Sequence, residues 1–274
     1  MLNFTDSTVP AVRPAPAVVP AVLPVELSVV VPVHNERENI APLVCEIVAA
    51  LSNVVPFEII YVDDGSSDGT GDALQHAALH TPMLRVLRHD QRAGQSTAIR
   101  SGVLAARGKW IATLDGDGQN DPADIPALLR EACSLAAQRG DDCVLIAGWR
   151  TTRRDSTCTR WQSQVANRVR ARLLNDGTPD AGCGLKIYAR SIFVSLPYFD
   201  HMHRFMPALV RREGGEVLSV PVNHRARLRG QSHYGLMNRL WTGLVDVTGV
   251  MWLSRRVRAP RVSEQRAAPV AGRR

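Results

Sequence analysis

Two carboxylates stand two residues apart at the point where an apolar segment of the chain ends. The segment 110–114 reads WIATL and continues into DGDGQ, which contains Asp115, Asp117 and Gln119. Carboxylates at this spacing can converge on one cation, and the amide oxygen of Gln119 can add a neutral ligand. Hard oxygen ligands of this kind suit Mg²⁺ or Mn²⁺. A glycine-rich turn that uses Asp for its backbone tolerance would give the same pattern, so both interpretations stay open at this point.

A second acidic pair follows another apolar segment. The segment 57–62 reads FEIIYV and ends in Asp63 and Asp64, which are followed by GSSDGT. A carboxylate at the end of a strand can accept hydrogen bonds from a ribose diol or from a base N–H. Asp68 fits a capping role for the next helix, but capping does not account for two adjacent acids before it. Asp63 and Asp64 are therefore candidates for a nucleoside site.

The elements that must position these acids alternate along the first half of the chain. We predict strands at 27–33, 57–62, 84–87, 110–114 and 143–147, and helices at 40–51, 94–107 and 122–138. Asn35 and Glu38 have the spacing of a capping box before the first helix. This alternation predicts an α/β fold with a mostly parallel sheet covered on both faces. Ligands of such sheets bind outside the carboxyl ends of the strands, where both acidic pairs stand.

The composition limits the classes of protein to consider. The chain has 274 residues, 45% of them hydrophobic and 22% charged, as expected for a globular chain with a sizeable core. Its five cysteines form no CxxC pair, which argues against a zinc ribbon or a disulfide scaffold and favours a reducing compartment. Cys183 lies between glycines and is expected to pack rather than react.

The positive charge is concentrated in the distal part of the chain. The net charge is +7, yet residues 201–274 contain 14 Arg and four acids. This asymmetry predicts an anionic partner such as lipid headgroups or a phosphate-bearing substrate, unless it is only a solvated basic face. Nucleic acid is disfavoured because the basic region lacks interleaved aromatic residues and the acidic pairs would repel phosphates.

The two ends of the chain differ from its middle. Residues 1–25 are rich in Pro, Ala and Val, lack the pattern of a signal peptide and are expected to be disordered, as is the basic tail 259–274. The segment 236–258 is predicted to be an amphipathic, membrane-proximal helix. Its apolar part is too short, and contains Asp246, to cross a hydrocarbon core about 30 Å thick. Its Trp and Arg residues suit a membrane interface, although a helix buried against the sheet would give the same pattern.

The motifs occur in an order that resembles a known family. A strand followed by PVHNE, a strand followed by DDGSSDGT and a strand followed by DGDGQNDP are similar to the inverting family 2 glycosyltransferases. Within that family the chain looks most like the dolichol-phosphate mannose synthase and polyprenyl-phosphate glycosyltransferase branch, from about residue 27 to about residue 258. The resemblance implies one GT-A domain, which we assign to residues 26–235.

The resemblance also implies which residues bind the nucleotide sugar. Those implied to line the nucleotide are Pro32, His34, Glu36, Val62, Asp63 and Asp64. Those implied to hold the metal, Mg²⁺ or Mn²⁺, and the diphosphate are Asp115, Gly116, Asp117 and Gln119. His34 stands where the family often has Tyr, so the base stays open between GDP- and UDP-linked donors.

Further correspondences lie in the second half of the chain. Arg150 ends a GWR segment similar to one that places an Arg near the phosphates, and Arg227 and His233 match basic positions of a segment that folds over the donor. The family commonly has Lys at the latter position. The stretch 160–174, with Arg168, Arg170 and Arg172, matches an acceptor loop and interfacial helix, or carries only solvated charges. The sequence DAGCGLK, from residue 180, resembles a turn on the acceptor side of the site.

The function that the resemblance implies is inverting transfer of a sugar from a nucleotide-diphospho-sugar to a polyprenyl phosphate of the dolichyl or undecaprenyl type. Asp117, Arg150 and Arg227 are the expected catalytic residues. A phosphate acceptor is already anionic, since its second pKa is about 6, and needs no strong base. We expect peripheral attachment to the cytoplasmic face of the membrane, or docking on a separate membrane partner.

Three alternative functions remain open. The acceptor could instead be a hydroxyl of a lipid glycan or polysaccharide, with Asp180 as the nearest candidate base. The chain could be a scaffold that binds nucleotide sugars without turnover, although both acidic pairs and Gln119 are present. A nucleotidyltransferase would need a phosphate loop rich in Gly, Arg and Lys after the first strand, which PVHNE is not.

Overall fold

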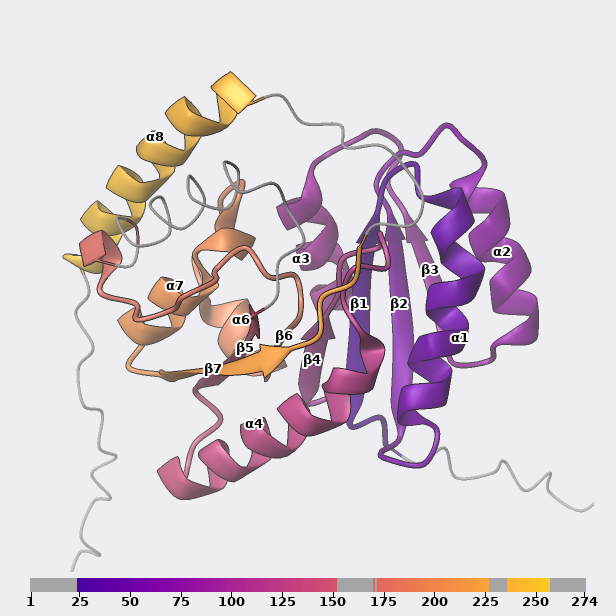
Figure 1. The fold of residues 1–274 in the computed structure, drawn as a ribbon, viewed down its shortest axis with the longest axis horizontal. Coiled ribbons are helices and arrows are strands. Elements are labelled where there is room, and N and C mark those ends of the chain that lie inside the picture. The colour runs from indigo at the N-terminus through magenta and orange to yellow at the C-terminus, as the bar shows by residue number, and fades with distance from the viewer. Residues whose placement is uncertain (1–23, 152–169, 171, 227–235, 257–274) are drawn as a thin grey trace, which may run out of the picture.

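The computed structural model describes residues 24–151, 170, 172–226 and 236–256. Its centre is a seven-stranded sheet in the order β3-β2-β1-β4-β6-β5-β7 (Figure 1). The strands are β1 Leu27–Val33, β2 Phe57–Asp63, β3 Leu84–Arg88, β4 Trp110–Thr113, β5 Val144–Arg150, β6 Lys186–Ala189 and β7 Glu216–Val222. The helices are α1 Ile40–Leu51, α2 Thr70–His80, α3 Gln95–Ala105, α4 Ile125–Arg139, α6 Arg190–Ser195, α7 Met206–Arg212 and α8 Leu236–Ser254. The predicted α/β class with a mostly parallel sheet is confirmed.

The middle of the sheet is built from short apolar strands. Every residue of β1, LSVVVPV, is buried, as expected for a strand covered on both faces. β1 pairs in parallel with β2 on one side and with β4 on the other. Helices α1 and α2 cover one face of this half of the sheet and α3 covers the other (Figure 1). The carboxyl ends of β2, β1 and β4 therefore lie side by side at one edge.

Two strands were not predicted from the sequence. The four-residue strand β6 lies between β4 and β5 and runs antiparallel to both. β7 pairs in parallel with β5 and is the outermost strand on that side of the sheet. Both escape pattern analysis because β6 is very short and β7 is partly exposed along most of its length. Since β6 is antiparallel, it begins at the edge where β4 ends, and this brings Lys186 opposite Thr113.

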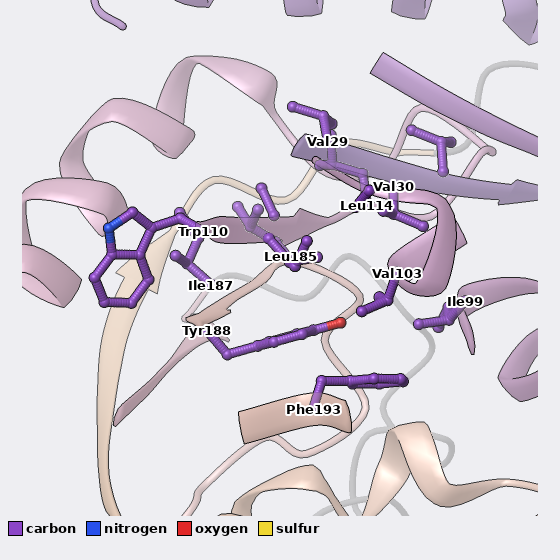
Figure 2. Close-up of a cluster of buried hydrophobic side chains, with 14 of the residues drawn as sticks. Val29, Val30, Ile99, Val103, Trp110, Leu114, Leu185, Ile187, Tyr188 and Phe193 are labelled. Carbon is purple, nitrogen blue, oxygen red and sulfur yellow. The ribbon is translucent and has the colours of Figure 1, made fainter. Parts of the chain in front are cut away.

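The core beneath this edge fixes β6 against the helices. Figure 2 shows the ring of Tyr188 lying flat against Phe193 of α6, and their ring centroids are 5.5 Å apart. Val103 and Ile99 of α3 complete this side of the cluster (Figure 2). Offset stacking of this kind adds to the free energy gained by burying aromatic area. The packing makes β6 a rigid support for the residues at its start.

The predicted capping box at Asn35 is wrong. Asn35 adopts a left-handed backbone conformation with φ of 58°, and its side-chain oxygen accepts a hydrogen bond from the backbone N of Ser67 at 2.9 Å. The chain then forms a short 3-10 helix, Arg37–Asn39, before α1 begins. Asn35 therefore links the loop after β1 to the loop after β2 instead of capping a helix.

The C-terminal helix α8 packs beside α7 (Figure 1). Val250 is buried on the packed side, whereas Trp252 is 61% exposed. Asp246 accepts a hydrogen bond from His201 Nδ1 at 3.1 Å, which fastens the helix to the rest of the fold. Within the described part of the chain, no helix has both the length and the apolar character needed to cross a membrane. The predicted boundaries at residues 25, 235 and 258 stay predictions.

Candidate active site

The loops after β1 and β2 form one end of the site. Pro32 lies beside Val62 and Val33 beside Asp63 in the parallel pairing. The backbone N of Asp64 donates to the Val33 carbonyl at 2.8 Å. His34 Nδ1 donates to the Asp64 carbonyl, also at 2.8 Å. These contacts bring together five of the residues that the sequence singled out for the nucleotide.

Asp64 holds the loop that precedes α3. Its carboxylate accepts hydrogen bonds from the backbone N of Ala93, the backbone N of Gly94 and the ring of His89, each at 2.8 Å. Burial alone would raise the pKa of Asp64, but these bonds outweigh it and lower the pKa below its usual value. The carboxylate therefore stays ionised and shapes the wall of the site through the 89–94 loop. His89, which also bonds Ser101 Oγ at 2.9 Å, was missed from the sequence because no motif marks it.

Asp63 and Glu36 also have local partners. Asp63 is buried and accepts from the backbone N of Ser66 at 2.9 Å. Glu36 accepts from Asn39 Nδ2 at 2.6 Å and lines an open cavity of about 320 Å³ together with Asp68. Asp63 thus shapes the turn after β2, and Glu36 borders open space beside it.

The second acidic pair lies at the end of β4, one strand beyond β1. Asp115 Oδ1 accepts from Gln95 Nε2 at 2.8 Å, and Asp117 Oδ1 accepts from the backbone N of Gln119 at 3.1 Å. Burial raises the pKa of Asp115, and the charge of the neighbouring Asp117 raises it further. A divalent cation would relieve the repulsion between these carboxylates, so the residues present fit an oxygen-ligated metal.

Two glycines let the backbone approach this pair closely. A Cβ on Gly116 would lie 2.4 Å from Val33 Cγ1, and a Cβ on Gly184 would lie 2.2 Å from a carboxylate oxygen of Asp115. No side chain fits at either distance. Gly116 therefore sets the 115–119 loop against the end of β1, and Gly184 allows the turn before β6 to reach Asp115.

Cationic side chains face the acidic pair from β5 and β6. Lys186 is buried and donates to the Cys183 carbonyl, and burial lowers the pKa of its ammonium group. Arg150 forms a two-pronged ion pair with Asp180, at 2.6 Å and 2.9 Å. Lys186 was not predicted to be a site residue. The sequence offered one indication of its importance. The chain has only two lysines, and this one stands next to apolar residues.

The chain after β7 is hydrogen-bonded across the 115–119 loop. The backbone N of Arg225 donates to the Gln119 carbonyl at 2.9 Å, and Gln119 Nε2 donates to the Arg225 carbonyl at 3.4 Å. The Arg225 guanidinium pairs with Glu46 at 2.6 Å and with Asp121 at 2.7 Å. Arg225 and Asp117 line a cavity of about 120 Å³ beside α1. Arg227 and His233, singled out from the sequence, lie outside the described residues.

The interpretation of Arg170 as a solvated helix charge is wrong. Arg170 is 9% exposed and donates to Asp176 at 2.6 Å. Its partner comes from the turn after the helix, so helical spacing alone gave no sign that the side chain points inward. Arg172 is exposed, and Arg168 lies outside the described residues. Cys183 is fully buried and burial raises the pKa of its thiol, which fits the expected packing role.

The chain is similar in sequence to known glycosyltransferases. The family described as "Glycosyl transferase family 2" matches residues 28–196. A dodecaprenyl-phosphate galacturonate synthase from Rhizobium johnstonii is 38% identical over 84% of this chain and 68% of its own length. An undecaprenyl-phosphate 4-deoxy-4-formamido-L-arabinose transferase from Edwardsiella ictaluri is 34% identical over 77% of this chain and 63% of its own length. The chain thus spans about two thirds of these curated relatives.

Solved structures resemble the fold. A glucosyl-3-phosphoglycerate synthase from Mycobacterium tuberculosis, in complex with Mn²⁺, UDP-glucose and phosphoglyceric acid, superposes with a TM-score of 0.62. The superposition covers 85% of this chain and 81% of the synthase, and the two sequences are 18% identical. A mannosyltransferase from Pyrobaculum calidifontis, in complex with GDP-mannose and Mn²⁺, gives a TM-score of 0.60 at 19% identity, over 86% of this chain and 66% of that one. At these identities the likeness establishes the fold, which is of the GT-A type, as the sequence predicted.

Proposed function

Because this chain belongs to glycosyl transferase family 2, we propose that it transfers a sugar, with inversion, from a nucleotide-diphospho-sugar to a polyprenyl phosphate. The observation that carries the proposal is the Asp115–Asp117 pair, which faces the cations Lys186 and Arg150 at the carboxyl edge of the sheet. Acids alone would repel a diphosphate, whereas acids that hold a metal beside fixed cations attract it. The polyprenyl-phosphate names of two curated relatives support the acceptor class.

The donor spans the edge of the sheet in this proposal. Its nucleoside lies against the loops after β1 and β2, where His34 and Asp64 meet, and its diphosphate lies near Asp115 and Asp117. Both complexes named above contain Mn²⁺ with a UDP- or GDP-linked sugar, which supports this donor class. A Mg²⁺ or Mn²⁺ ion held by Asp115, Asp117 and Gln119 would neutralise charge on the leaving diphosphate.

The chain's own residues provide the remaining steps. Arg150 presents a permanent positive charge that favours departure of the nucleoside diphosphate, and Arg227 is proposed to add a second. An oxygen of the acceptor phosphate attacks the anomeric carbon from the face opposite the diphosphate. The bond from the anomeric carbon to the diphosphate oxygen breaks, and its electron pair leaves with the nucleoside diphosphate. Inversion follows from this single displacement.

We place the acceptor at the cytoplasmic leaflet of a membrane, with α8 as the contact or with a separate membrane partner. Val245 and Trp252 are exposed on α8, and Arg255 and Arg256 follow at its end. An exposed Trp beside Arg residues is typical of a segment that lies in the headgroup region. The test is sedimentation with vesicles of anionic or neutral lipid: wild-type protein is expected to bind the anionic vesicles, and Trp252→Ser to bind them less.

The transfer reaction is tested with purified protein, Mg²⁺ or Mn²⁺, a panel of UDP- and GDP-sugars and a short polyprenyl phosphate. The expected product is an acid-labile glycosyl phosphodiester, detected by mass spectrometry. Asp117→Ala is expected to abolish its formation. Asp72→Ala is the matched control, because Asp72 is an exposed acid on α2. Full turnover by Asp117→Ala would contradict the metal assignment, and donor binding without any transfer would favour the scaffold.

A further inference from the structure

A buried ion pair joins the end of β5 to the turn before β6. Arg150 Nε donates to Asp180 Oδ2 at 2.6 Å, and Arg150 Nη2 donates to Oδ1 at 2.9 Å. The backbone N of Arg150 also donates to Oδ2, at 3.4 Å. Asp180 is 3% exposed. Both carboxylate oxygens therefore accept from one guanidinium, the forked geometry in which arginine binds a carboxylate most firmly.

The turn after Asp180 is shaped around this pair. The backbone N of Cys183 donates to the Asp180 carbonyl at 3.4 Å. A Cβ on Gly182 would lie 3.3 Å from Arg150 Nη2, and a Cβ on Gly184 would lie only 2.2 Å from a carboxylate oxygen of Asp115. One short turn thus contacts both the guanidinium and the proposed metal ligand. It fixes the position of Arg150 relative to Asp115.

A second buried ion pair supports the chain just before Asp180. Arg170 donates to Asp176 Oδ2 at 2.6 Å and to the Thr178 carbonyl at 3.0 Å. The backbone N of Thr178 donates to Asp176 Oδ1 at 3.1 Å, and Asp176 is fully buried. The short segment 176–180 therefore supplies acceptors to two arginines, one at each end. This arrangement restrains Asp180 from behind.

The pair leaves Asp180 poorly suited to accept a proton. Burial alone would lower the pKa of Arg150. The hydrogen bonds from Arg150 to Asp180 and the negative charge of Asp180 outweigh this effect and raise the pKa of Arg150 above its usual value. Protonation of Asp180 would break those bonds and leave a charged guanidinium in the protein interior without its partner, which is strongly unfavourable. A general base must instead be able to take a proton from the nucleophile at little cost.

We propose that Asp180 is a positioning residue that holds Arg150 against the leaving diphosphate, and that it is not a general base. This inference rests on the proposed function: a hydroxyl acceptor would need Asp180 as its base, whereas the phosphate acceptor proposed above needs none. The bond from the phosphate oxygen to the anomeric carbon forms as the bond to the diphosphate breaks. No proton moves, so the step balances without a base.

The first experiment is a double-mutant cycle on binding of UDP and of GDP, each with Mn²⁺, measured by calorimetry. Asp180→Asn and Arg150→Met are each expected to weaken binding of the preferred nucleotide tenfold to roughly a hundredfold, the loss of one charge-assisted contact. The double variant is expected to bind no more weakly than Arg150→Met alone, since both changes disable one group. Effects that multiply, or an unchanged affinity in Asp180→Asn with a lower kcat, overturn the inference.

Asp141→Asn is the matched control for these variants. Arg139 and Asp141 also form a two-pronged pair, at 3.0 Å and 3.1 Å, but it is solvent-exposed and stands before the start of β5. Nucleotide affinity of Asp141→Asn is expected to equal that of the wild type. The pH dependence of kcat adds a second readout. An acidic limb that is present in the wild type and absent in Asp180→Asn identifies a base and overturns the inference.

A second experiment needs no variant and so does not depend on whether Asp180→Asn folds. Wild-type protein receives the preferred donor with either a short polyprenyl phosphate or the polyprenol of the same length. Transfer to the phosphate alone supports the inference, and transfer to the polyprenol overturns it. Absence of nucleotide binding and of transfer to either acceptor contradicts the proposed function itself, and the two failures are thereby distinguished.

Discussion

The fold favours the ionised form of an acid at one end of the parallel strands and disfavours it at the other end. At the amino edge, Glu58 accepts from Ser28 Oγ at 2.7 Å, from the backbone N of Arg107 at 2.7 Å and from Arg85 at 2.6 Å. Burial raises the pKa of Glu58, but these bonds outweigh it and bring the pKa below 4.5. At the carboxyl edge, burial and the charge of Asp117 raise the pKa of Asp115.

The contrast separates an acid that stabilises the fold from a pair that we propose binds a ligand. Donors from three different parts of the chain converge on Glu58, so its ionised form is the form that the fold favours. Asp115 and Asp117 instead oppose each other's charge, and the fold sustains that repulsion. Strained electrostatics of this kind concentrate at functional sites, because a bound cation or substrate relieves them.

The largest expected effect is on catalysis at the carboxyl edge. Asp117→Asn is expected to lower the transfer rate roughly a hundredfold to a thousandfold, as loss of an electrostatic contact to the reacting groups does. Its thermal stability without metal is expected to be no lower than that of the wild type, because the change removes repulsion on Asp115. Scanning calorimetry with and without Mn²⁺ checks this.

The metal provides the internal control for that variant. Mn²⁺ at a hundred times its dissociation constant is expected to stabilise the wild type by about 2.7 kcal/mol and Asp117→Asn by much less. A variant that unfolds at a clearly lower temperature without metal would show that Asp117 serves the fold, and the contrast between the two edges would fail.

The next largest effect is on stability at the amino edge. Glu58→Gln leaves Arg85 without its ionic partner and is expected to lower the free energy of unfolding by about 2 kcal/mol, within the range for a lost charge-assisted hydrogen bond. Urea unfolding measures this change. Turnover per folded molecule is expected to stay within about twofold of the wild type, given that Glu58 lies at the far edge.

Glu131→Gln is the control for that substitution, since Glu131 is exposed on α4. It is expected to change the free energy of unfolding by less than about 0.5 kcal/mol. A large loss of turnover in Glu58→Gln, with the folded fraction intact, would mean that the amino edge also serves catalysis.

The carboxyl-edge site was predictable because its residues directly follow strands that the sequence marks clearly. Runs such as LSVVVPV and FEIIYV have the composition of buried strands, and the structure has strands at both. Once a parallel sheet is predicted, the positions of Asp64 and Asp115 at one edge follow from topology. Local patterns were therefore enough for the fold class and for the acidic pairs.

The cationic part of the site was less predictable because it depends on contacts between distant segments. Asp180 is 30 residues from Arg150, and its role as a partner became visible only when the antiparallel strand β6 placed the turn beside β5. Lys186 is the first residue of the same strand and is buried there. A strand of four residues is too short for its hydrophobic pattern to be recognised from the sequence. Arg170 looked like a surface charge for the same reason: the sequence does not show which side of a helix the tertiary fold covers.

A smaller effect is expected on the stability of the protein at acid pH, where Glu58 becomes protonated. A carboxyl whose pKa is lower in the folded than in the unfolded chain contributes stability that is present above the unfolded value and is lost as the pH falls through the folded one. For Glu58 the loss begins near 4.5 and continues below it. The wild type is therefore expected to lose more stability than Glu58→Gln over this range. Thermal unfolding between about pH 6 and pH 3 compares them, and parallel curves would contradict the prediction.

The smallest expected effect concerns the two ion pairs at the opposite ends of β5. Arg139–Asp141 has nearly the same geometry as Arg150–Asp180, but the Asp141 side chain is 49% exposed and that of Asp180 is 4% exposed. Solvent screens the exposed pair, so Asp141→Asn is expected to cost less than about 1 kcal/mol of stability. The cost is expected to shrink in 1 M salt, since the Debye length there is about 3 Å. Urea unfolding at low and high salt measures both quantities. A cost as large as that of Asp180→Asn would mean that forked geometry alone, without burial, sets the strength of these pairs.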